Sequence, residues 1–440
     1  MQLSVRSAAE WQGSYRILKA PRHAGPPAQR DPLVVARVTE MLGAISAEGF
    51  DAVLRYAKEL DGWARSDVEL DAAAVAASGD GLDPALRSAL EIGAERTQRF
   101  ATETRSRLAD FETELAPGVR AGHRYLPVPR VGAYLPAGRF PILASAFMTV
   151  GVAKAAGVPT VLACTPPQPD GRPDPAVLYS AHLSGADRVF VLGGVQALAA
   201  MAFGLLGDRS VDMLVGAGNA YVAEAKRQLF GTVAIDLLAG PSEIGVIADD
   251  TADPEIVAAD LLGQAEHGPE SPAALVTTSE AFGRAVIHEV ERQLSGLATS
   301  SIAAPAWRDY GSVIWAADAE TAAALMDDLA PEHLEVMTAD DDFYFDTLQN
   351  YGSIFLGPWS TVAYSDKGMA GTNHVLPTAG GARHSAGLSV SRFLRPLTYQ
   401  RVERAATPLL AEPVEAIARY EGMDAHRATA TKRLARYATG

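Results

Sequence analysis

The sequence predicts an α/β protein with two doubly wound parallel sheets and small helical extensions at both ends. From about residue 128, apolar strand-like segments alternate with helical ones, and a second stretch of this kind runs from about 242 to 358. Such alternation is typical of parallel sheets covered by helices. The 440 residues, 48% of them hydrophobic, are enough for two to four units of roughly 100–200 residues.

The N-terminal third is predicted to be mainly helical. Residues 33–62 show helical spacing of apolar positions, and residues 83–115 are predicted to form one long helix. Asp83 stands directly before Pro84, which is a typical capping arrangement. The segment before residue 31 ends in a Pro- and Gly-rich loop.

The two alternating stretches supply the predicted sheets. In the first, strands are expected at 131–136, 160–164, 187–194 and 211–218. In the second, IGVIAD, ALVTTS and SVIWAA are expected strands, with helices at 254–266 and 280–294 between them. Residues 361–396 are rich in Gly, Thr, Ser and His and lack periodicity, and so long an irregular stretch is usually functional. Helical patterns return at the C-terminus.

Composition excludes several classes of protein. The chain has 38 basic and 53 acidic residues, a net charge of −15, and no clustered basic stretch, so we expect no nucleic-acid partner. Cys164 is the only cysteine, which rules out an internal disulfide and a thiolate metal cluster. Its context predicts a strand end rather than a nucleophile. No apolar run approaches the ~20 residues of a membrane span, and the first residues lack a signal-length apolar stretch. We expect a cytoplasmic protein that has no membrane partner.

Two glycine-rich turns follow predicted strands, GGVQ at 193–196 and GAGN at 216–219. A turn of this kind can hold a pyrophosphate on its backbone N–H groups. The full GxGxxG fingerprint is absent, and Asn219 has the alternative role of a helix N-cap.

The segment QAEH ends a predicted helix. Gln264 and His267 are three residues apart and therefore share one helix face, whereas Glu266 points elsewhere. An amide oxygen and an imidazole could ligate one divalent metal, but zinc needs about four donors. The alternative is an ordinary helix-end histidine near the negative end of the helix dipole.

A second Glu-His pair occurs in PEHLE. Glu332 and His333 follow Pro331, where we predict a helix start. Both side chains could reach a cleft there, and His is the usual general base near neutral pH. Helix capping by Glu332 and a solvated His333 is the alternative.

Two further segments carry metal-binding residue types. Asp366 and His374 lie in a Gly-rich loop, where a carboxylate could complete a metal site or simply form an Asx turn. Glu421 and His426 occur in EGMDAH near the C-terminus, where a solvated helix is the alternative.

Together these segments resemble the histidinol dehydrogenase family. The resemblance covers about residues 30 to 435, with matching order and spacing of GAYLPAGR, GGVQALAA, VGAGNAYVAEAK, FGTVAIDLLAGPSE, DLLGQAEH, PEHLE, GTNHVLPT and EGMDAH. It implies a zinc-dependent, NAD-linked enzyme that takes a primary alcohol through an aldehyde to a carboxylate. It also implies an intertwined homodimer in which the segment with Glu421 and His426 reaches the partner's site.

The resemblance assigns roles to twelve residues. The implied zinc ligands are Gln264, His267, Asp366 and His426. The implied catalytic pair is Glu332 and His333. The implied NAD contacts are Tyr134, Gln196 and Asn219, and the implied substrate contacts are Ser242, His374 and Glu421. A non-catalytic paralogue would be expected to lack Glu332 or His333, and both are present.

We divide the chain into four parts on this basis. Residues 1–30 form an N-terminal arm. Residues 31–133 and 242–388 form a first α/β domain with the zinc and catalytic residues. Residues 134–241 form a second, Rossmann-like domain that binds NAD, and residues 389–440 form an extension that reaches the partner subunit.

Two departures from the family pattern bear on the substrate. The loop from Asp366 to His374 is one residue longer than usual, and Ala144 stands where histidinol enzymes usually have a serine. The rest of the sequence resembles the branch of the family typified by sulfopropanediol dehydrogenase. A small polar alcohol such as (R)-2,3-dihydroxypropane-1-sulfonate, which would give sulfolactate, is therefore expected, with L-histidinol as the alternative. Candidates to hold the sulfonate, by residue type alone, are Arg139, Arg383 and His384.

Overall fold

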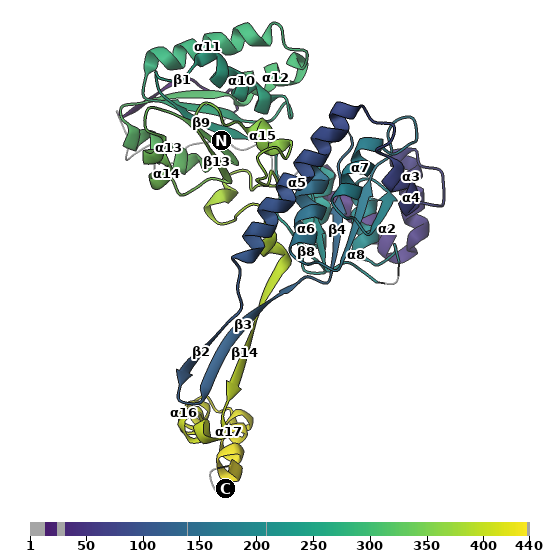
Figure 1. Ribbon diagram of the computed structural model, residues 1–440, viewed down its shortest axis with the longest axis vertical. Coiled ribbons are helices and arrows are strands. Elements are labelled where there is room, and N and C mark those ends of the chain that lie inside the picture. Colours follow the sequence, from purple (N-terminus) through teal and green to yellow (C-terminus); the bar gives the residue numbers. More distant parts are fainter. Residues whose placement is uncertain (1–13, 24–30, 139, 208, 438–440) are drawn as a thin grey trace.

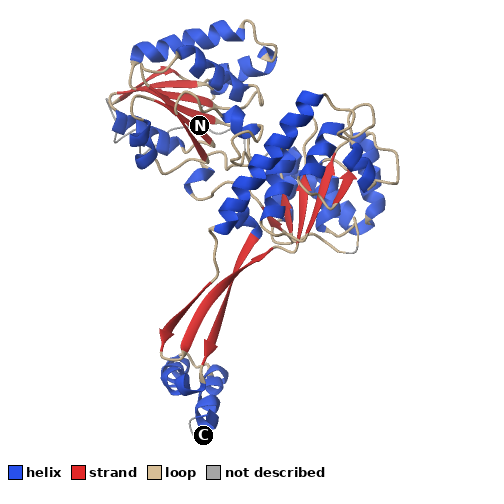
Figure 2. Cartoon of the chain, viewed as in Figure 1, coloured by secondary structure: helices blue, strands red, loops and turns tan. Residues whose placement is uncertain are grey.

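The computed structural model describes residues 14–23, 31–138, 140–207 and 209–437 of the chain. Two α/β units lie next to each other, and a long three-stranded arm leaves them and ends in two helices (Figure 1). The cartoon in Figure 2 shows each sheet between helices and the strands of the arm standing clear of them. Within the described residues, no helix combines the length and apolar character that crossing a bilayer requires.

The first sheet has five parallel strands in the order β6-β5-β4-β7-β8. Their bounds are Arg130–Tyr134 (β4), Thr160–Thr165 (β5), Arg188–Val191 (β6), Met213–Val215 (β7) and Ala234–Ile235 (β8). By order of appearance the strands run 3-2-1-4-5, the doubly wound order that the sequence predicted. The central strands β4 and β5 are buried along almost their whole length because helices cover both faces.

The helices of the N-terminal third pack on this five-stranded sheet. Their bounds are Pro32–Glu48 (α2), Phe50–Asp61 (α3), Ala72–Ala77 (α4) and Pro84–Ser106 (α5). Helices α2 and α3 contact α8 (Gly194–Ala202), and α2 also contacts α9 (Ala220–Leu229). On the other face, α4 and α5 contact α7 (Pro175–Leu183), and α5 contacts the short π-helix η1 (Phe147–Gly151) and α6 (Val152–Ala155).

This packing corrects the predicted division at residue 133. The residues from 31 to 106 were assigned to the unit with the zinc ligands, but their apolar side chains are buried against the five-stranded sheet. Helix α5 is also shorter than predicted, since it ends at Ser106 and residues 111–116 form a strand. Pairing with a distant strand overrides the helical pattern there. The predicted Asp83 cap is confirmed, because its side chain accepts from Ala85 N and Leu86 N.

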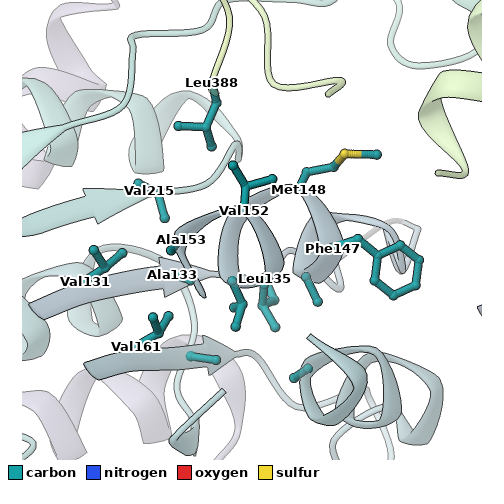
Figure 3. Packing of buried hydrophobic residues seen from close by; sticks show 14 of the residues in the cluster. Val131, Ala133, Leu135, Phe147, Met148, Val152, Ala153, Val161, Val215 and Leu388 are labelled. Atoms are coloured by element: carbon teal, nitrogen blue, oxygen red, sulfur yellow. The ribbon is translucent and has the colours of Figure 1, made fainter. Parts of the chain in front are cut away.

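The core of the first unit also includes a segment from late in the chain. Figure 3 shows Val131 and Ala133 of β4 packed against Val152 and Ala153 of α6, with Leu388 above them. Leu388 comes from the segment before the last strand, so the C-terminal part of the chain returns to this core.

The second sheet has six strands in the order β1-β11-β10-β9-β12-β13. Their bounds are Tyr15–Lys19 (β1), Ile244–Ala248 (β9), Ala273–Thr277 (β10), Ser312–Ala316 (β11), His333–Met337 (β12) and Ser353–Leu356 (β13). The five parallel strands again follow the order 3-2-1-4-5. Strand β1 pairs antiparallel with β11 at the edge, so the described part of the predicted N-terminal arm belongs to this sheet.

The helices of the second unit lie on both faces of the six-stranded sheet. Their bounds are Pro254–Ala265 (α10), Glu280–Leu294 (α11), Ser300–Tyr310 (α12), Ala319–Leu329 (α13) and Asp341–Thr347 (α14). A short helix, Val362–Asp366 (α15), follows β13 and faces the first unit in Figure 1. The rest of the irregular stretch contains short turns at Gly381–Arg383 (η2) and Val390–Phe393 (η3).

The arm consists of Phe111–Ala116 (β2), Val119–Pro127 (β3) and Leu394–Val402 (β14), with both neighbouring pairs antiparallel. After a short turn at Arg404–Ala406 (η4), it ends in the helices Thr407–Tyr420 (α16) and Asp424–Tyr437 (α17). In Figure 1 these helices lie far from both α/β units. Large apolar side chains of α16 are exposed, including Leu409, Ile417 and Tyr420.

Candidate active site

The predicted catalytic pair lies at the amino edge of the six-stranded sheet. Strands β9 and β12 are neighbours in register, with Ile244 opposite His333. Ser242 and Glu243 therefore meet Glu332 at this edge, just before the two strands begin. A helix that connects parallel strands runs opposite to them, so the C-terminal end of α10 also arrives here. This is how residues 242, 264, 267, 332 and 333 gather.

A hydrogen-bonded relay joins three of these segments. The Gln264 amide Nε2 donates to Ser242 Oγ at 2.5 Å, and the Ser242 hydroxyl donates to Glu332 Oε2 at 2.6 Å. The backbone N–H of Glu243 donates to the same carboxyl oxygen at 2.9 Å. Burial raises the pKa of Glu332 to about 8, and these hydrogen bonds oppose the rise. Glu332 is therefore fixed in position and close to its titration range near neutral pH.

The imidazole of His333 is held through one nitrogen and free at the other. Its Nδ1 lies 3.1 Å from the carbonyl oxygen of Glu243, which can only accept, so Nδ1 carries the proton. Its Nε2 is buried and has no partner among the described residues. Burial lowers the pKa of His333, with an opposing effect of Asp366, so the ring is neutral near pH 7. A neutral ring with a free Nε2 is the form that accepts a proton.

The prediction of a helix start at PEHLE is wrong. His333 is the first residue of strand β12, and Glu332 lies just before it. The five residues of β12 are all buried, which is the pattern of a central parallel strand rather than of a helix cap. A strand start nevertheless brings both side chains to the same edge.

Three other predicted residues meet beside this pair. His267 Nε2 lies 3.6 Å from Asp366 Oδ2, and His374 Nδ1 lies 3.8 Å from Asp366 Oδ1. Burial opposes ionisation of Asp366, but His374, His333 and His267 lower its pKa overall. Desolvation lowers the pKa of His267 and of His374, with an opposing effect of Asp366. An ionised carboxylate between neutral imidazoles is a donor set that suits a divalent metal.

Gln264 is a further candidate metal ligand from the same chain. Its Oε1 is buried and without a partner among the described residues, while its Nε2 is engaged by Ser242. An orphaned amide oxygen one turn from His267 is free to ligate a cation. Glu266 makes a different contact, since its Oε2 accepts from the Thr299 hydroxyl at 2.7 Å. The residues present therefore fit zinc.

Glu421 and His426 lie elsewhere in a single chain. Both are exposed on the helices at the end of the arm (Figure 1). Within the described part of the chain, no group of three or more His, Cys, Asp or Glu is placed to hold a metal by itself. One chain thus brings together three of the four predicted zinc ligands and leaves the fourth on the arm.

The three predicted cofactor residues lie at the carboxyl edge of the five-stranded sheet. Tyr134 ends β4, Gln196 lies in α8, and Asn219 precedes α9. Adjacent strands β4 and β7 are connected in opposite directions, so this is the switch point where doubly wound sheets bind ligands. Asn219 also caps α9, since its Oδ1 accepts from Tyr221 N at 3.0 Å. Asn219 can thus cap α9 and also contact a cofactor at this edge.

Gln196 presents a free acceptor at this edge. Its Nε2 donates to Asp61 Oδ2 at 2.7 Å, which leaves Oε1 buried and without a partner among the described residues. Asp61 also accepts from Gly193 N at 3.0 Å, and Gly194 N donates to the Tyr134 hydroxyl at 3.3 Å. The GGVQ turn is thereby fixed with an unsatisfied oxygen, as a ligand with a hydroxyl or amide donor would require.

A buried ion pair supports the GAGN turn. Lys226 Nζ donates to Gly216 O at 2.9 Å and pairs with Asp236, which accepts from Gly216 N at 2.7 Å. Gly216 has φ +118°, and a Cβ there would lie 2.3 Å from Tyr134 O, so only glycine fits. Lys226 and Asp236 were not predicted as site residues, because nothing in the local sequence distinguishes them from solvated charges.

Cys164 is fully buried in β5, and burial raises its pKa above the usual range, which agrees with a structural role. Arg383 donates to Asp328 O, and His384 is exposed beside it, so neither candidate sulfonate residue is shown near His333. Arg139 lies outside the described residues.

Comparison with known proteins extends this picture. The family model described as histidinol dehydrogenase matches residues 26–434. Sulfopropanediol 3-dehydrogenase of Ruegeria pomeroyi is 45% identical over 402 residues, which are 91% of this chain and 92% of that protein. A histidinol dehydrogenase of Parasynechococcus marenigrum is 40% identical over 401 residues, covering 91% of each. The crystal structure of histidinol dehydrogenase from Elizabethkingia anophelis superposes with a TM-score of 0.88 at 33% identity, covering 94% of both chains.

Proposed function

The chain belongs to the histidinol dehydrogenase family, and we propose that it is a zinc-dependent, NAD-linked dehydrogenase that oxidises a primary alcohol through an aldehyde to a carboxylate. The single observation that carries this proposal is the free, buried Nε2 of a neutral His333 beside the Glu332 carboxyl. In each turnover the alcohol and one water give the carboxylate, and two molecules of NAD accept the two hydrides.

His333 and Glu332 have different tasks in this proposal. Loss of a hydride from the alcohol requires that its hydroxyl proton be taken, and His333 Nε2 is the base for that step. The aldehyde must add water before the second hydride can leave. Glu332, held by Ser242 and the Glu243 N–H, activates that water, and its raised pKa matches this role near neutral pH.

The cofactors are assigned to the two edges described above. Zinc, held by Gln264, His267, Asp366 and a His426 from a second copy of the chain, would supply substrate positioning and polarisation. NAD would occupy the edge formed by Tyr134, Gln196 and Asn219. The orphaned Oε1 atoms of Gln264 and Gln196 support both assignments.

A homodimer with shared sites belongs to the same proposal. His426 is exposed at the end of an arm that leads away from its own active-site residues (Figure 1). Exposed apolar side chains on α16 give the arm a surface to bury against another chain. We therefore propose that the arm of each subunit completes the site of the other.

The substrate we favour is a small polar alcohol such as (R)-2,3-dihydroxypropane-1-sulfonate, which would be oxidised to sulfolactate. The sulfopropanediol 3-dehydrogenase at 45% identity supports it, as does Ala144 in place of the family serine. L-Histidinol is the second candidate. It is supported by relatives named histidinol dehydrogenase at 38–41% identity and by the presence of Ser242, His374 and Glu421.

The first test is a direct assay. Purified, zinc-loaded enzyme with NAD is offered the sulfonate diol and L-histidinol in separate reactions, and NADH formation is followed. Preference for one substrate decides between the two candidates. Absence of NADH formation with either would contradict both substrate proposals.

The role of His333 is tested by His333→Asn, which keeps a hydrogen bond to Glu243 O but removes the basic Nε2. We expect the kcat for alcohol oxidation to fall about 10²–10⁴-fold. Zinc content, measured by atomic emission, should remain that of the wild type. Loss of zinc in this variant would show that His333 is a ligand and would contradict the assignment.

A further inference from the structure

We propose that Asn373 is a positioning residue that clamps the loop between Asp366 and His374 onto the first unit, and so sets the distance between substrate and cofactor. The inference rests on the proposed dehydrogenase function, because it concerns how that function brings its two reactants together. Asn373 acts through the loop, which carries a proposed zinc ligand at one end and a proposed substrate contact at the other.

The two halves of the proposed site belong to different units. Glu332 and His333 lie at the edge of the six-stranded sheet, whereas Tyr134 and Gln196 lie at the edge of the five-stranded sheet. A hydride passes between two carbon atoms only when they are about 3–3.5 Å apart, and a misplacement of about 1 Å can lower the rate about 10²-fold. Contacts that join the two units near the site therefore affect the rate of hydride transfer.

The side chain of Asn373 makes such a contact. Its Nδ2 donates to the carbonyl oxygen of Met148 at 2.9 Å, and its Oδ1 accepts from Val375 N at 2.8 Å. Met148 is fully buried in the π-helix η1 of the first unit. One end of the amide thus holds the backbone around His374 in a turn, and the other end binds the first unit.

The carbonyl group that Asn373 binds is fixed relative to the proposed cofactor edge. The helix α6 continues directly from η1, and Figure 3 shows α6 packed on strand β4, whose last residue is Tyr134. The Met148 N–H donates to Ala144 O at 3.0 Å, and Ala144 stands where histidinol enzymes usually have a serine. Short π-helical turns are rare and frequently occur at functional sites.

A close backbone contact next to Asn373 also joins the loop to the first unit. A Cβ added at Gly93 of α5 would lie 2.9 Å from Lys367 O, and one added at Gly368 would lie 3.1 Å from Gly93 O. The Phe147 ring of η1 lies 3.1 Å and 3.2 Å from these two Cβ positions. A side chain at Gly93 would require the loop to shift away from α5. This glycine therefore gives an independent means of disturbing the clamp.

A shift of the loop would reach the functional residues at both of its ends. The Thr372 hydroxyl donates to Ser365 Oγ at 3.0 Å. His374 Nδ1 lies 3.3 Å from the carbonyl oxygen of Asp366. These contacts hold the two ends of the loop together, so a change at Asn373 is passed to Asp366 as well as to His374.

The test uses variants of the full-length, zinc-loaded enzyme. Asn373→Ser and Asn373→Asp keep an acceptor for Val375 N but lose the donor to Met148 O, and the serine does so without adding a charge. Gly93→Ala adds a Cβ at the contact with the loop. Gly43→Ala is the matched control, because Gly43 is exposed in α2 and an added Cβ there meets no atom within 4 Å.

The first phase of NADH formation is followed in single turnovers, with the alcohol that the wild type oxidises either unlabelled or deuterated at the carbinol carbon. The amplitude reports the fraction of active sites, and a rate constant that deuterium lowers reports hydride transfer. Zinc content and the Kd of NAD are measured on the same samples. Hydrogen exchange of residues 144–155 and 366–376, followed by mass spectrometry, is a readout that needs no turnover.

We expect Asn373→Ser, Asn373→Asp and Gly93→Ala to lower the rate constant of hydride transfer about 10- to 100-fold at unchanged amplitude. Zinc content and the Kd of NAD should remain those of the wild type, and hydrogen exchange should increase in both segments. Gly43→Ala should behave as wild type. A lower amplitude with a wild-type rate constant would overturn the proposal, because Asn373 would then serve folding alone. An effect confined to Asn373→Asp would also overturn it, because the added charge would then be the cause.

Two outcomes separate this inference from the function on which it rests. Wild-type rate constants and unchanged hydrogen exchange in every variant would overturn the clamp and leave the dehydrogenase standing. Increased exchange of both segments in Asn373→Ser and Gly93→Ala, in a protein that oxidises no alcohol with NAD, would support the clamp and overturn the proposed function.

Discussion

At the scale of single residues, burial sets the protonation states that the chemistry needs. His333 is neutral because its ring is buried, and its Nδ1 proton is held by the Glu243 carbonyl. Glu332 is buried at the same edge but retains proton affinity, because Ser242 and the Glu243 N–H offset only part of the cost of burying its charge. One buried environment thus lowers the pKa of the imidazole and raises that of the carboxyl, because burial disfavours the charged form of each.

Glu332→Gln should alter how stability depends on pH. Burial raises the pKa of Glu332 from its ordinary value of 4.5 to about 8, so the folded state holds this proton more tightly than the unfolded chain. The associated stability is complete below about pH 4.5 and is lost as pH rises to about 8, by at most about 1.4 kcal/mol per pH unit. Glutamine accepts the same hydrogen bonds from Ser242 and Glu243 without titrating.

The measurement is urea unfolding of zinc-free wild type and Glu332→Gln between about pH 5 and pH 9. The stability of the variant relative to the wild type should increase across this range and level off above about pH 8. Parallel stability curves for the two proteins would show that the Glu332 carboxyl is not perturbed.

At the scale of elements, two buried carboxyl groups connect the segments that carry the site. Asp260 lies on α10 on the same face as Gln264 and His267, and Glu335 lies on β12 on the same face as His333. Burial together with the charge of Asp260 raises the pKa of Glu335 well above its usual value. Asp260 Oδ2 and Glu335 Oε2 are both buried and have no other partner among the described residues. A Glu335 that keeps its proton is able to donate it to the Asp260 carboxylate, and we infer that the two groups share this proton.

This pair also positions the helix that carries Asp366. The Val362 N–H at the start of α15 donates to Glu335 Oε1 at 2.9 Å, and the Thr361 hydroxyl donates to Asp260 Oδ1 at 2.9 Å. Asp366 is the last residue of that helix. The pair thus fixes α10, β12 and α15, and with them three of the proposed zinc and catalytic segments.

Glu335→Gln and Glu335→Leu distinguish this link from simple packing. Glutamine can accept from Val362 N and donate to Asp260, so zinc content and kcat should stay within about two-fold of wild type, the effect of a few tenths of a kcal/mol. Leucine leaves the Asp260 carboxylate buried without a donor for one oxygen, at a cost of about 1–3 kcal/mol or more. Thermal unfolding and zinc analysis give the comparison. Equal damage by both substitutions would contradict a shared proton.

The sequence predicted some of these elements and missed others for identifiable reasons. Gln264 and His267 share a helix face, which helical spacing alone reveals. Glu332 and His333 were found as a pair, but in the wrong type of element, because five residues are too few to separate a buried strand from a helix start. Asp260 and Glu335 could not be found at all, since a buried carboxyl pair looks like two surface acids until the fold brings them together.

At the scale of the whole molecule, local periodicity predicted that the two sheets form. It did not predict which helices pack on which sheet, or which distant strands pair. The alternation of strands and helices predicted doubly wound parallel sheets, and the parallel strands of both sheets have the order 3-2-1-4-5. The helices of residues 32–106 were assigned to the wrong sheet, because an apolar helix face does not specify which sheet covers it. The arm pairs β3 with β14 across more than 260 residues of sequence, and no local pattern reveals such a pairing. The position of His426 on that arm follows from this long-range pairing.

The proposed sharing of sites between subunits predicts complementation between two inactive variants. In His333→Asn the base is lost but the arm is intact, whereas in His426→Ala the arm lacks its ligand but His333 is intact. In a mixed dimer, one site combines both defects, and the other combines an intact His333 with an intact His426 from the opposite chain. Co-expressed variants that pair at random would therefore regain about a quarter of wild-type activity, because half of the dimers are mixed and half of their sites are intact.

The measurement compares the NADH formation rate of co-expressed, differently tagged chains after purification through both tags with the rates of the two single variants. Purification through both tags selects mixed dimers, so activity should rise to about half that of wild type, again because one site in two is intact. If each arm instead folded back onto its own subunit, both sites of a mixed dimer would carry one defect, and activity would stay at the level of the single variants. That outcome would place His426 in the site of its own chain and would require the arm to leave the extended position it has in Figure 1.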